Sequence, residues 1–436
     1  MATESETTWT NLLKIMFKPG NLRAAMPDNF LLYNWLHDRA GGIVPYGGSE
    51  IRFPVKNQKQ AGIGAVATGA SSLPTATISN SLLAKFNVRY VYGVGEIDDM
   101  VMEISRSSDF AYEQATQQTR QDLLVSLKQV INAAWYDDGR CRLGVFPAAD
   151  DQQTITLSQP ILAMQGQRFD VIDATDDSTE LLSGATVDAI NHQGVANNLL
   201  QGTLTYSETA ISGSAASDYL VPENWIAAGT QLGPFGIRAG CTSANPSLEN
   251  YGQINRSTGG NEAWQGNRLH NSAVNRAWRV SLATAMLNLI RRRSSQMIDL
   301  EDVRIVNDRN LTQEIFEQVA TDQQIVTRGK EALTISTGFK GGSGKSFQPY
   351  GMLHGVNPMI QDESAPANVQ FFLTPNTWHI TETGPPKLVD EDGAVLHRFE
   401  GRGAYQFRYR YFHEVYTTTP SANGILEDLQ VTNPAA

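Results

Sequence analysis

Large apolar residues recur at three- and four-residue steps through part of residues 107–139, which predicts one long helix. Leu123, Leu127 and Ile131 mark this stripe, which continues to Trp135. The segment contains no proline or internal glycine and is rich in Gln, Ala, Leu and Arg, which have good helix propensity. At 1.5 Å per residue the helix spans about 45 Å, which is longer than a compact domain of ordinary size requires.

The two halves of this predicted helix differ in polarity. Between Glu113 and Gln121 the chain has almost no large apolar residue, whereas the apolar stripe occupies the second half. Residues 107–109 offer side-chain acceptors for the first turn, and Gly139 can take the left-handed conformation that ends a helix. We expect only the second half to lie on a core of its own chain.

Alternating apolar and polar residues predict a long two-stranded hairpin before the helix. About thirty residues between the two strands, from 57 to 87, are dominated by Gly, Ala, Ser and Thr and are too poor in large side chains to build a core. A loop of this length is explained if it packs on a neighbouring subunit. The alternating apolar positions are Ile51, Phe53 and Val55 on the way out and Phe86, Val88, Tyr90 and Tyr92 on the way back.

Short apolar runs at nearly regular spacing predict a small β-barrel or sandwich over residues 148–222. These runs are 155–157, 167–172, 186–190, 199–206 and 219–221. A second strong helix is expected over 271–293, with Val274, Trp278, Leu282, Ala285, Met286 and Leu289 as its stripe. The other expected elements are helices at 28–38 and 311–319 and strands at 300–306, 332–335, 350–356, 369–373, 378–381, 395–399 and 405–415.

Composition narrows the class of protein. At 436 residues and 41% hydrophobic content the chain can form two or three domains with real cores. Cys141 and Cys241 give no disulfide framework, and the first ten residues lack the regions of a signal peptide, so we expect folding in a reducing cytoplasm. No apolar run reaches the ~20 residues needed to cross a bilayer. A net charge of −11 opposes a broad electrostatic hold on nucleic acid.

No catalytic or cofactor motif is complete. The GGSGKS segment at 341–346 evokes a phosphate-binding loop, but Phe339 stands where the motif needs a glycine, and Pro349 follows where a helix should continue. Gly62, Gly64 and Ala67 resemble a degenerate dinucleotide fingerprint, but neither an apolar strand nor a helix flanks them. We interpret both segments as structural, and we predict no catalytic and no cofactor-binding residues.

Metal ligation is not indicated either. Asp173, Asp176 and Asp177, and likewise residues 390–392, lack the alternation of an EF-hand and are expected in solvated turns. No Gly-x-Ser-x-Gly elbow is present. The histidines, which show no metal-ligand spacing, are His37, His192, His270, His354, His379, His397 and His413.

Two basic features bear on nucleic acid. Aromatic residues alternate with Gln406, Arg408 and Arg410 near the C-terminus, which is compatible with a base-stacking face; we expect instead a half-buried strand with its aromatic side inward. The run 291–293 consists of arginines at a predicted helix C-terminus, where cations complement the dipole. Acidic groups of a partner subunit suit this run at least as well as DNA does. The aromatic residues are Tyr405, Phe407, Tyr409 and Tyr411.

The order of these elements resembles the tailed-phage major capsid proteins of the Hong Kong 97 fold. The resemblance covers nearly the whole chain without a strict motif. It is carried by EIRFPVKNQKQAGIGAVATGASS and KFNVRYVYGVGEIDD for an extended loop, SSDFAYEQATQQTRQDLLVSLKQVINAAW for a spine helix, and VQFFLTPNTWHI with FRYRYFHEVYTTTPSANGIL at the end.

This resemblance implies an α+β fold with an N-terminal arm, an extended loop, a spine helix, peripheral and axial domains, and an inserted small β domain. The implied divisions are an arm at 1–48, an extended β-hairpin loop at 49–97, a peripheral domain at 98–140 and 346–436, an axial domain at 141–147 and 223–345, and an inserted barrel-like domain at 148–222. Some members crosslink a loop lysine to a neighbour's asparagine. Lys56 and Lys59 are eligible by position, but their partner is not identifiable, so crosslinking is not predicted.

The resemblance also implies a function. We expect a structural protein, not an enzyme, that assembles as pentamers and hexamers into an icosahedral shell around double-stranded DNA, with weak non-specific DNA contact. Portal, scaffold and possibly decoration or cement proteins are the other expected partners, without a membrane. The implied location is the virion capsid, assembled in the host bacterial cytoplasm. The alternatives are an encapsulin-type nanocompartment shell, or a β-rich hydrolase without a recognisable motif.

Overall fold

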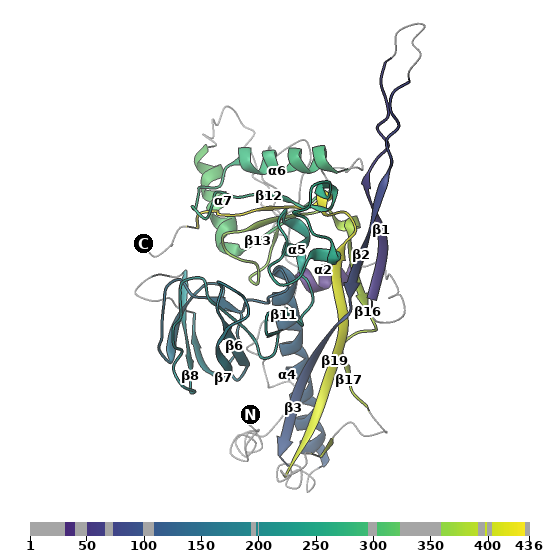
Figure 1. The fold of residues 1–436 in the computed structure, drawn as a ribbon. Coiled ribbons are helices and arrows are strands. Elements are labelled where there is room, and N and C mark those ends of the chain that lie inside the picture. Colours follow the sequence, from purple (N-terminus) through teal and green to yellow (C-terminus); the bar gives the residue numbers. More distant parts are fainter. Residues whose placement is uncertain are drawn as a thin grey trace, which may run out of the picture.

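One long helix and two long strands run side by side through the molecule (Figure 1). Helix α4 (Asp109–Tyr136) has 28 residues and lies against strand β3 (Arg89–Asp98), which pairs antiparallel with β19 (Ala404–Thr417). The computed structural model describes residues 31–39, 50–65, 73–98, 109–192, 198, 200–294, 303–322, 359–390, 397–398 and 403–431.

The second half of α4 is anchored on this strand pair, as its apolar stripe predicts. Leu127, Ile131 and Trp135 are buried, and the Trp135 indole N–H donates to His413 Nε2 on β19 at 3.1 Å. At the middle of the helix Gln121 is exposed. The side chains of 109–118 lie outside the described residues, so the expectation that the first half lies on no core of its own chain stays a prediction.

The hairpin differs from its prediction in where the returning strand ends. Strand β1 (Glu50–Gln58) pairs antiparallel with β2 (Asn80–Asn87), and the chain then passes through Val88 into β3, which pairs with β19 instead. The predicted single strand from Phe86 to Tyr92 is therefore two strands in different sheets. An alternating apolar and polar pattern predicts a strand but does not indicate which strand it pairs with. The break at Val88 also changes which residues face inward.

Residues 144–222 close into a six-stranded barrel in the order β4-β5-β8-β7-β6-β9. The barrel is filled by fully buried side chains that include Ile155, Leu157, Phe169 and Leu204. Its first strand comes from the stretch 141–147 that was assigned to the axial domain. The strands are β4 (Gly144–Val145), β5 (Thr154–Ser158), β6 (Arg168–Ile172), β7 (Glu180–Asn191), β8 (Gln201–Tyr206) and β9 (Tyr219–Pro222).

A second sheet joins distant parts of the sequence in the order β12-β20-β15-β13-β14. Helix α6 (Val280–Arg293) packs on β12 and β20, and Met286, Ile305 and Phe372 are buried in the core they share. Helix α7 (Arg309–Asp322) follows β13. The strands are β12 (Asn267–Leu269), β13 (Arg304–Asn307), β14 (Met359–Gln361), β15 (Gln370–Leu373) and β20 (Gly424–Leu426).

This sheet divides the C-terminal region differently from the sequence-based division. Residues 346–436 were assigned as one block to the domain of the spine helix, but β14, β15 and β20 pair with β12 and β13 from the 223–345 block. A run of short apolar strands does not reveal which sheet each strand joins. The strands that do lie beside β19 are β16 (Trp378–Glu382), β17 (Lys387–Leu388) and β18 (His397–Arg398).

The helix expected over 271–293 begins only at Val280. Tertiary contacts override the helical pattern before it, because the backbone amides of Asn271 and Ala273 both donate to the Asp428 carboxylate, and Ala273 has a φ of 62°. Val274, assigned to the apolar stripe, is exposed. The buried face of the helix consists of Ala283, Met286, Leu287 and Ile290.

Short elements complete the described fold. Helix α2 (Leu31–Arg39) docks on α4, where the Tyr33 amide donates to Asn132 Oδ1 at 3.1 Å and the Tyr33 ring stacks on Trp135. The others are β10 (Ile226–Ala227), β11 (Thr230–Gln231), α5 (Ile237–Cys241), and 3₁₀ turns η1 (Tyr251–Gln253), η2 (Glu262–Trp264), η4 (Pro375–Thr377) and η5 (Pro420–Ala422). Among the described residues, no helix is both long and apolar enough to span a membrane.

The aromatic strand faces inward as expected. Phe407 and Tyr411 are buried, Tyr405 and Tyr409 are half-buried, and Arg408 is exposed. Several other predictions lie outside the described residues. These are the N-cap at 107–108, the strands at 332–335 and 350–356, and the 341–346 glycine segment.

We predict that Gly95→Ala destabilises the protein. An added Cβ at Gly95 overlaps the ring of Phe407, its partner in the β3–β19 register, and that ring is fully buried. Overpacking of this kind costs about 1–3 kcal/mol, which thermal unfolding detects as a lowered midpoint. Gly259→Ala is the matched control, because a Cβ there meets nothing within 4 Å. Equal midpoints for the two variants contradict this packing.

Candidate functional site

The hairpin exposes large aliphatic side chains that no described part of its own chain covers. At its base Phe53 and Phe86 pack in a cluster with Trp264 and Tyr416. Farther out, Ile63, Leu73 and Ile78 are 91%, 84% and 83% exposed. The hairpin projects well beyond the body of the molecule (Figure 1). Exposed apolar residues gathered on one projecting element are typical of a protein interaction surface.

The outer face of the β3–β19 strand pair is a second surface of this kind. Tyr90, Tyr92 and Val94 on β3 are 56%, 54% and 46% exposed. The Tyr90 ring stands edge-on to Phe412 of β19, with centroids 4.6 Å apart. Helix α4 packs beside β3, with Leu123 close to Gly93. Successive strand residues point to opposite faces, so one face carries α4 and the other presents aromatic rings to solvent.

A buried ion network lies where the hairpin joins the body. The Arg89 guanidinium donates to the Gln231 carbonyl at 2.9 Å, pairs with Glu249, and lies 3.8 Å from Glu414 Oε2. Glu414 on β19 is fully buried and accepts the Phe235 amide at 2.8 Å. Burial raises the pKa of the Glu414 carboxyl to about 8, although the charge of Arg89 opposes this shift. The network ties the start of β3 to β19 and to the loop before η1.

The histidines beside the network are structural. Burial, together with the charge of His37, lowers the pKa of His413 to about 3, so its neutral ring accepts the Trp135 hydrogen bond. Tyr411 stacks on His413 with centroids 4.0 Å apart, and its hydroxyl donates to Glu382 Oε2 at 2.7 Å. In the part of the chain that the structure describes, no three His, Cys, Asp or Glu side chains are placed to hold a metal ion.

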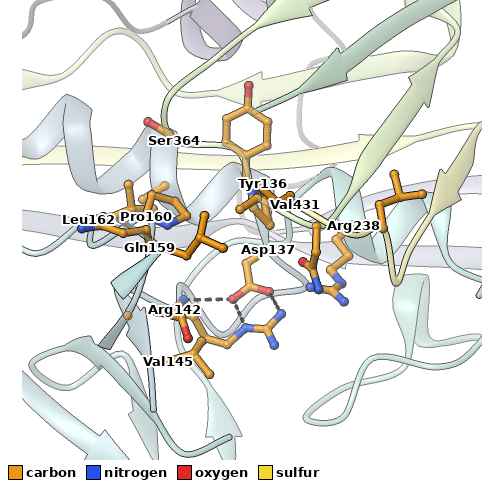
Figure 2. A pocket seen from close by; sticks show the side chains of 18 of the residues that line it. Tyr136, Asp137, Arg142, Val145, Gln159, Pro160, Leu162, Arg238, Ser364 and Val431 are labelled. Atoms are coloured by element: carbon orange, nitrogen blue, oxygen red, sulfur yellow. Dashed lines mark hydrogen bonds and ion pairs between the residues drawn. The ribbon is translucent and has the colours of Figure 1, made fainter. Parts of the chain in front are cut away.

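A pocket of about 430 Å³ lies between the barrel, the end of α4 and the segments 364–368 and 429–431. Figure 2 shows Asp137 and Arg142 side by side in it. The Asp137 carboxylate accepts both the backbone amide and the Nε–H of Arg142, at 2.9 and 2.8 Å. Burial disfavours the charged carboxylate, but the charge and hydrogen bonds of Arg142 prevail and hold the pKa of Asp137 well below its usual range.

Part of the polar lining of this pocket is engaged in contacts within the chain. Its one lining carboxylate is committed to Arg142, and neither His nor Cys lines it. Cys141 and Cys241 are buried thiols, and burial raises the pKa of both, so neither is an activated nucleophile. The pocket marks the place where the barrel attaches to the body.

The structure places the remaining sequence-based candidates at separate positions. Lys56 and Lys59 are exposed on the hairpin. Asp173 and Asp176 lie in a turn, but Asp177, expected to be solvated, is buried, accepting from Arg140 at 3.0 Å and from the Tyr219 hydroxyl at 2.6 Å.

Arg89 and Glu414 were not identified from sequence. Each occupies an ordinary polar position in an alternating strand, and nothing local indicates that the two meet. The arginine run 291–293 does not act as one unit either. Arg293 donates to the Gly266 carbonyl at 3.0 Å, whereas Arg291 and Arg292 are exposed.

Comparison with known proteins identifies the fold. No protein-family model and no curated protein matches the chain. A chain of the cyanophage A-1(L) capsid is 14% identical, with a TM-score of 0.55 over 94% of this chain and 95% of that chain. A chain of the native GTA particle capsid is 10% identical, with a TM-score of 0.45 over 95% of both chains. The holo-SrpI encapsulin of Synechococcus elongatus PCC 7942 is 9% identical, with a TM-score of 0.42 over 98% of this chain and 96% of that chain.

The likeness to the cyanophage chain extends over nearly the full length of both chains. The chain therefore has the fold of phage capsid proteins, and the resemblance to the Hong Kong 97 fold that the sequence indicated is confirmed.

We predict that Arg89→Met weakens the junction between hairpin and body. The substitution keeps an apolar stem but leaves Glu414 buried without its cation, and breaking a buried pair costs about 3–5 kcal/mol. Chemical denaturation at pH 9, above the Glu414 pKa of about 8, measures the loss in the free energy of unfolding. Arg52→Met is the control, because its pair with Glu50 is more exposed and is worth less than about 1 kcal/mol. Equal losses in the two variants contradict a special role for Arg89.

Glu414 also predicts a pH dependence of stability. In the unfolded chain the carboxyl ionises near its usual value of 4.5, whereas in the folded chain it keeps its proton to about 8. Between these values the folded state binds more protons, so the free energy of unfolding falls as pH rises.

Glu414→Gln removes this fall, on the order of a few kcal/mol, because glutamine does not ionise. Denaturant titrations at pH 5 and pH 9 compare the variant with the wild type and with Glu363→Gln, an exposed control. A wild-type loss between pH 5 and 9 that persists undiminished in Glu414→Gln contradicts the assignment.

Proposed function

We propose that this chain is the major capsid protein of a tailed double-stranded DNA bacteriophage, a subunit that assembles with copies of itself into an icosahedral shell. The observation that carries the proposal is the projecting hairpin, whose Ile63, Leu73 and Ile78 are left exposed by the described parts of their own chain. In a monomer these apolar side chains stay in water and add no stability. In a shell, a subunit buries them on a neighbour. The shared fold with a cyanophage capsid chain supports the same function.

The aromatic outer face of β3 supports assembly independently. Tyr90, Tyr92 and Val94 form a contiguous apolar surface next to Phe412, and aromatic side chains dominate the energetics of protein interfaces. Two separate uncovered surfaces on one chain allow each copy to contact more than one neighbour. Contacts of this kind close into rings, and we propose pentamers and hexamers as those rings.

The sheets suggest how the subunit is divided in the shell. We propose that α4 with β3 and β16–β19 forms the peripheral domain. The sheet of β12, β13, β14, β15 and β20, with α6 and α7, forms the axial domain around the capsomer axis. The barrel at 144–222 is the inserted domain, and 1–48 is the arm. This division moves β14, β15 and β20 into the axial domain, because they hydrogen-bond to its strands.

The net negative charge of the chain is compatible with a shell that encloses DNA. With a net charge of −11 the chain gains little electrostatic attraction to DNA phosphates. Contact with the packaged genome is therefore weak and non-specific. Portal, scaffold and decoration or cement proteins are the further partners, and assembly takes place in the host bacterial cytoplasm before the protein resides in the virion. The proposed role is structural rather than enzymatic, consistent with the pocket's committed carboxylate.

We predict that the purified wild-type protein forms closed shells visible by negative-stain electron microscopy. Leu73→Asp with Ile78→Asp places two charges in the proposed hairpin contact and abolishes closed shells while leaving a folded subunit. The matched control is Ser79→Asp with Ser81→Asp, which adds the same charge at exposed polar positions of the same hairpin and preserves the shells.

Wild-type protein that stays monomeric at every concentration, salt and scaffold condition contradicts the proposed function. Shells that enclose an enzyme rather than double-stranded DNA replace it with the nanocompartment function. Closed shells from the double-aspartate hairpin variant contradict the role given to the hairpin.

A further inference from the structure

The negative charge of this chain is concentrated in the barrel. Residues 144–222 contain ten Asp and Glu but only one Lys or Arg, Arg168, which gives a net charge of −9 out of −11 for the whole chain. Some of these carboxylates are used internally, because Asp170 and Asp218 are buried and accept the backbone amides of Gly184 and Ala174. The exposed acids are Asp151, Asp176, Glu180 and Asp188.

The opposite charge is concentrated around helix α6. Residues 263–298 contain six arginines and no acidic residue. Arg268 pairs with Glu427, and Arg276 and Arg293 donate to backbone carbonyls. Arg279, Arg291 and Arg292 are exposed, and their side chains make no ion pair or hydrogen bond with any described residue. We refer to these last three as the α6 arginines.

Helix α6 and the strands of the barrel lie in different parts of one subunit. Helix α6 packs on β12 and β20 and runs along the upper edge of the molecule in Figure 1, whereas the barrel lies at the lower left. Among the described residues, no ion pair joins an α6 arginine to a barrel carboxylate of the same chain, so each copy presents an acidic surface and a basic surface to other molecules. Complementary surfaces at different places on one molecule generate head-to-tail contacts, which form rings when the rotation closes.

We propose that the α6 arginines of one copy dock on the acidic outer wall of the barrel of a second copy. The inference rests on the proposed shell function and names one contact within it. On the barrel the wall is represented by Glu180 and Asp188 of β7, which are exposed and whose carboxylates form no hydrogen bond or ion pair with another described residue.

The exposed face of α6 favours a protein partner over DNA. Between its two ends this face presents Ser281, Ala285 and Asn288, which are small and uncharged. Val280 is also 38% exposed beside it. A surface that follows a phosphate backbone carries cations along its whole length, whereas here the cations stand only at the ends. A rigid acidic wall matches that arrangement and covers the apolar positions between them.

Charge reversal with rescue tests the contact. One variant carries Arg291→Glu with Arg292→Glu, a second carries Glu180→Lys with Asp188→Lys, and a third combines all four changes. Each of the first two sets like charges against each other in every contact, so shell yield at low salt falls by roughly tenfold or more. The combined variant restores attraction with the signs exchanged, and its shells reappear. Arg309→Glu and Glu363→Lys are exposed controls outside both surfaces, and circular dichroism confirms that every variant is folded.

Each outcome decides between the alternatives. If both double variants lose shells and the combined variant forms them again, the contact is established. Normal shells from both double variants overturn it while leaving the proposed function intact, because wild-type shells are measured in the same experiment. Normal shells that have lost only their DNA in the Arg291→Glu, Arg292→Glu variant also overturn it, because they assign the α6 arginines to the genome. Failure of the wild-type protein to form shells at every concentration, salt and scaffold condition refutes the proposed function itself.

Discussion

The packing of α4 on the β3–β19 strand pair is the interaction on which the rest of the structure depends. Trp135 is buried at this contact, bonded to a neutral His413 and stacked against Tyr33 of α2. Through these residues one helix holds the docked helix α2 and the strand that carries the hairpin, and its C-terminal end leads directly into the barrel. The burial of large aromatic groups together with their hydrogen bonds makes this region rigid, so elements attached to it keep their directions.

Because the centre is rigid, the outer elements keep apolar surface uncovered and charges unpaired within one chain. The hairpin projects from the body (Figure 1), and the Arg89 network ties its base to the body. The outer face of β3 cannot be covered by α4, because that helix already packs beside the strand pair. The acidic barrel and the α6 arginines are likewise held apart. The same architecture therefore accounts for uncovered apolar surface and for segregated charge, and the proposed shell resolves both by bringing copies of the chain together.

Sequence patterns predict this fold unevenly, for physical reasons. The α4 stripe, the barrel strands and the inward aromatic face of β19 follow from local periodicity, since burial on one side imposes it. The start of α6 does not, because bonds to Asp428 hold 271–279 out of the helix. Strand partners are also hidden, which is why β2 and β3 appear as one strand and why the C-terminal strands were assigned to a single domain. The Arg89–Glu414 pair depends on residues far apart in the chain, and no local signal marks it.

The central claim is that neighbouring copies cover the surfaces that one chain leaves open. Hydroxyl-radical footprinting measures it directly by comparing side-chain oxidation in dissociated subunits and in the assembled particle. The account predicts strong protection of Leu73, Ile78, Tyr90 and Tyr92 on assembly, with little change at Tyr219, which is already buried in the barrel. Assembled particles in which the hairpin residues and the β3 tyrosines stay as reactive as in the free subunit contradict it.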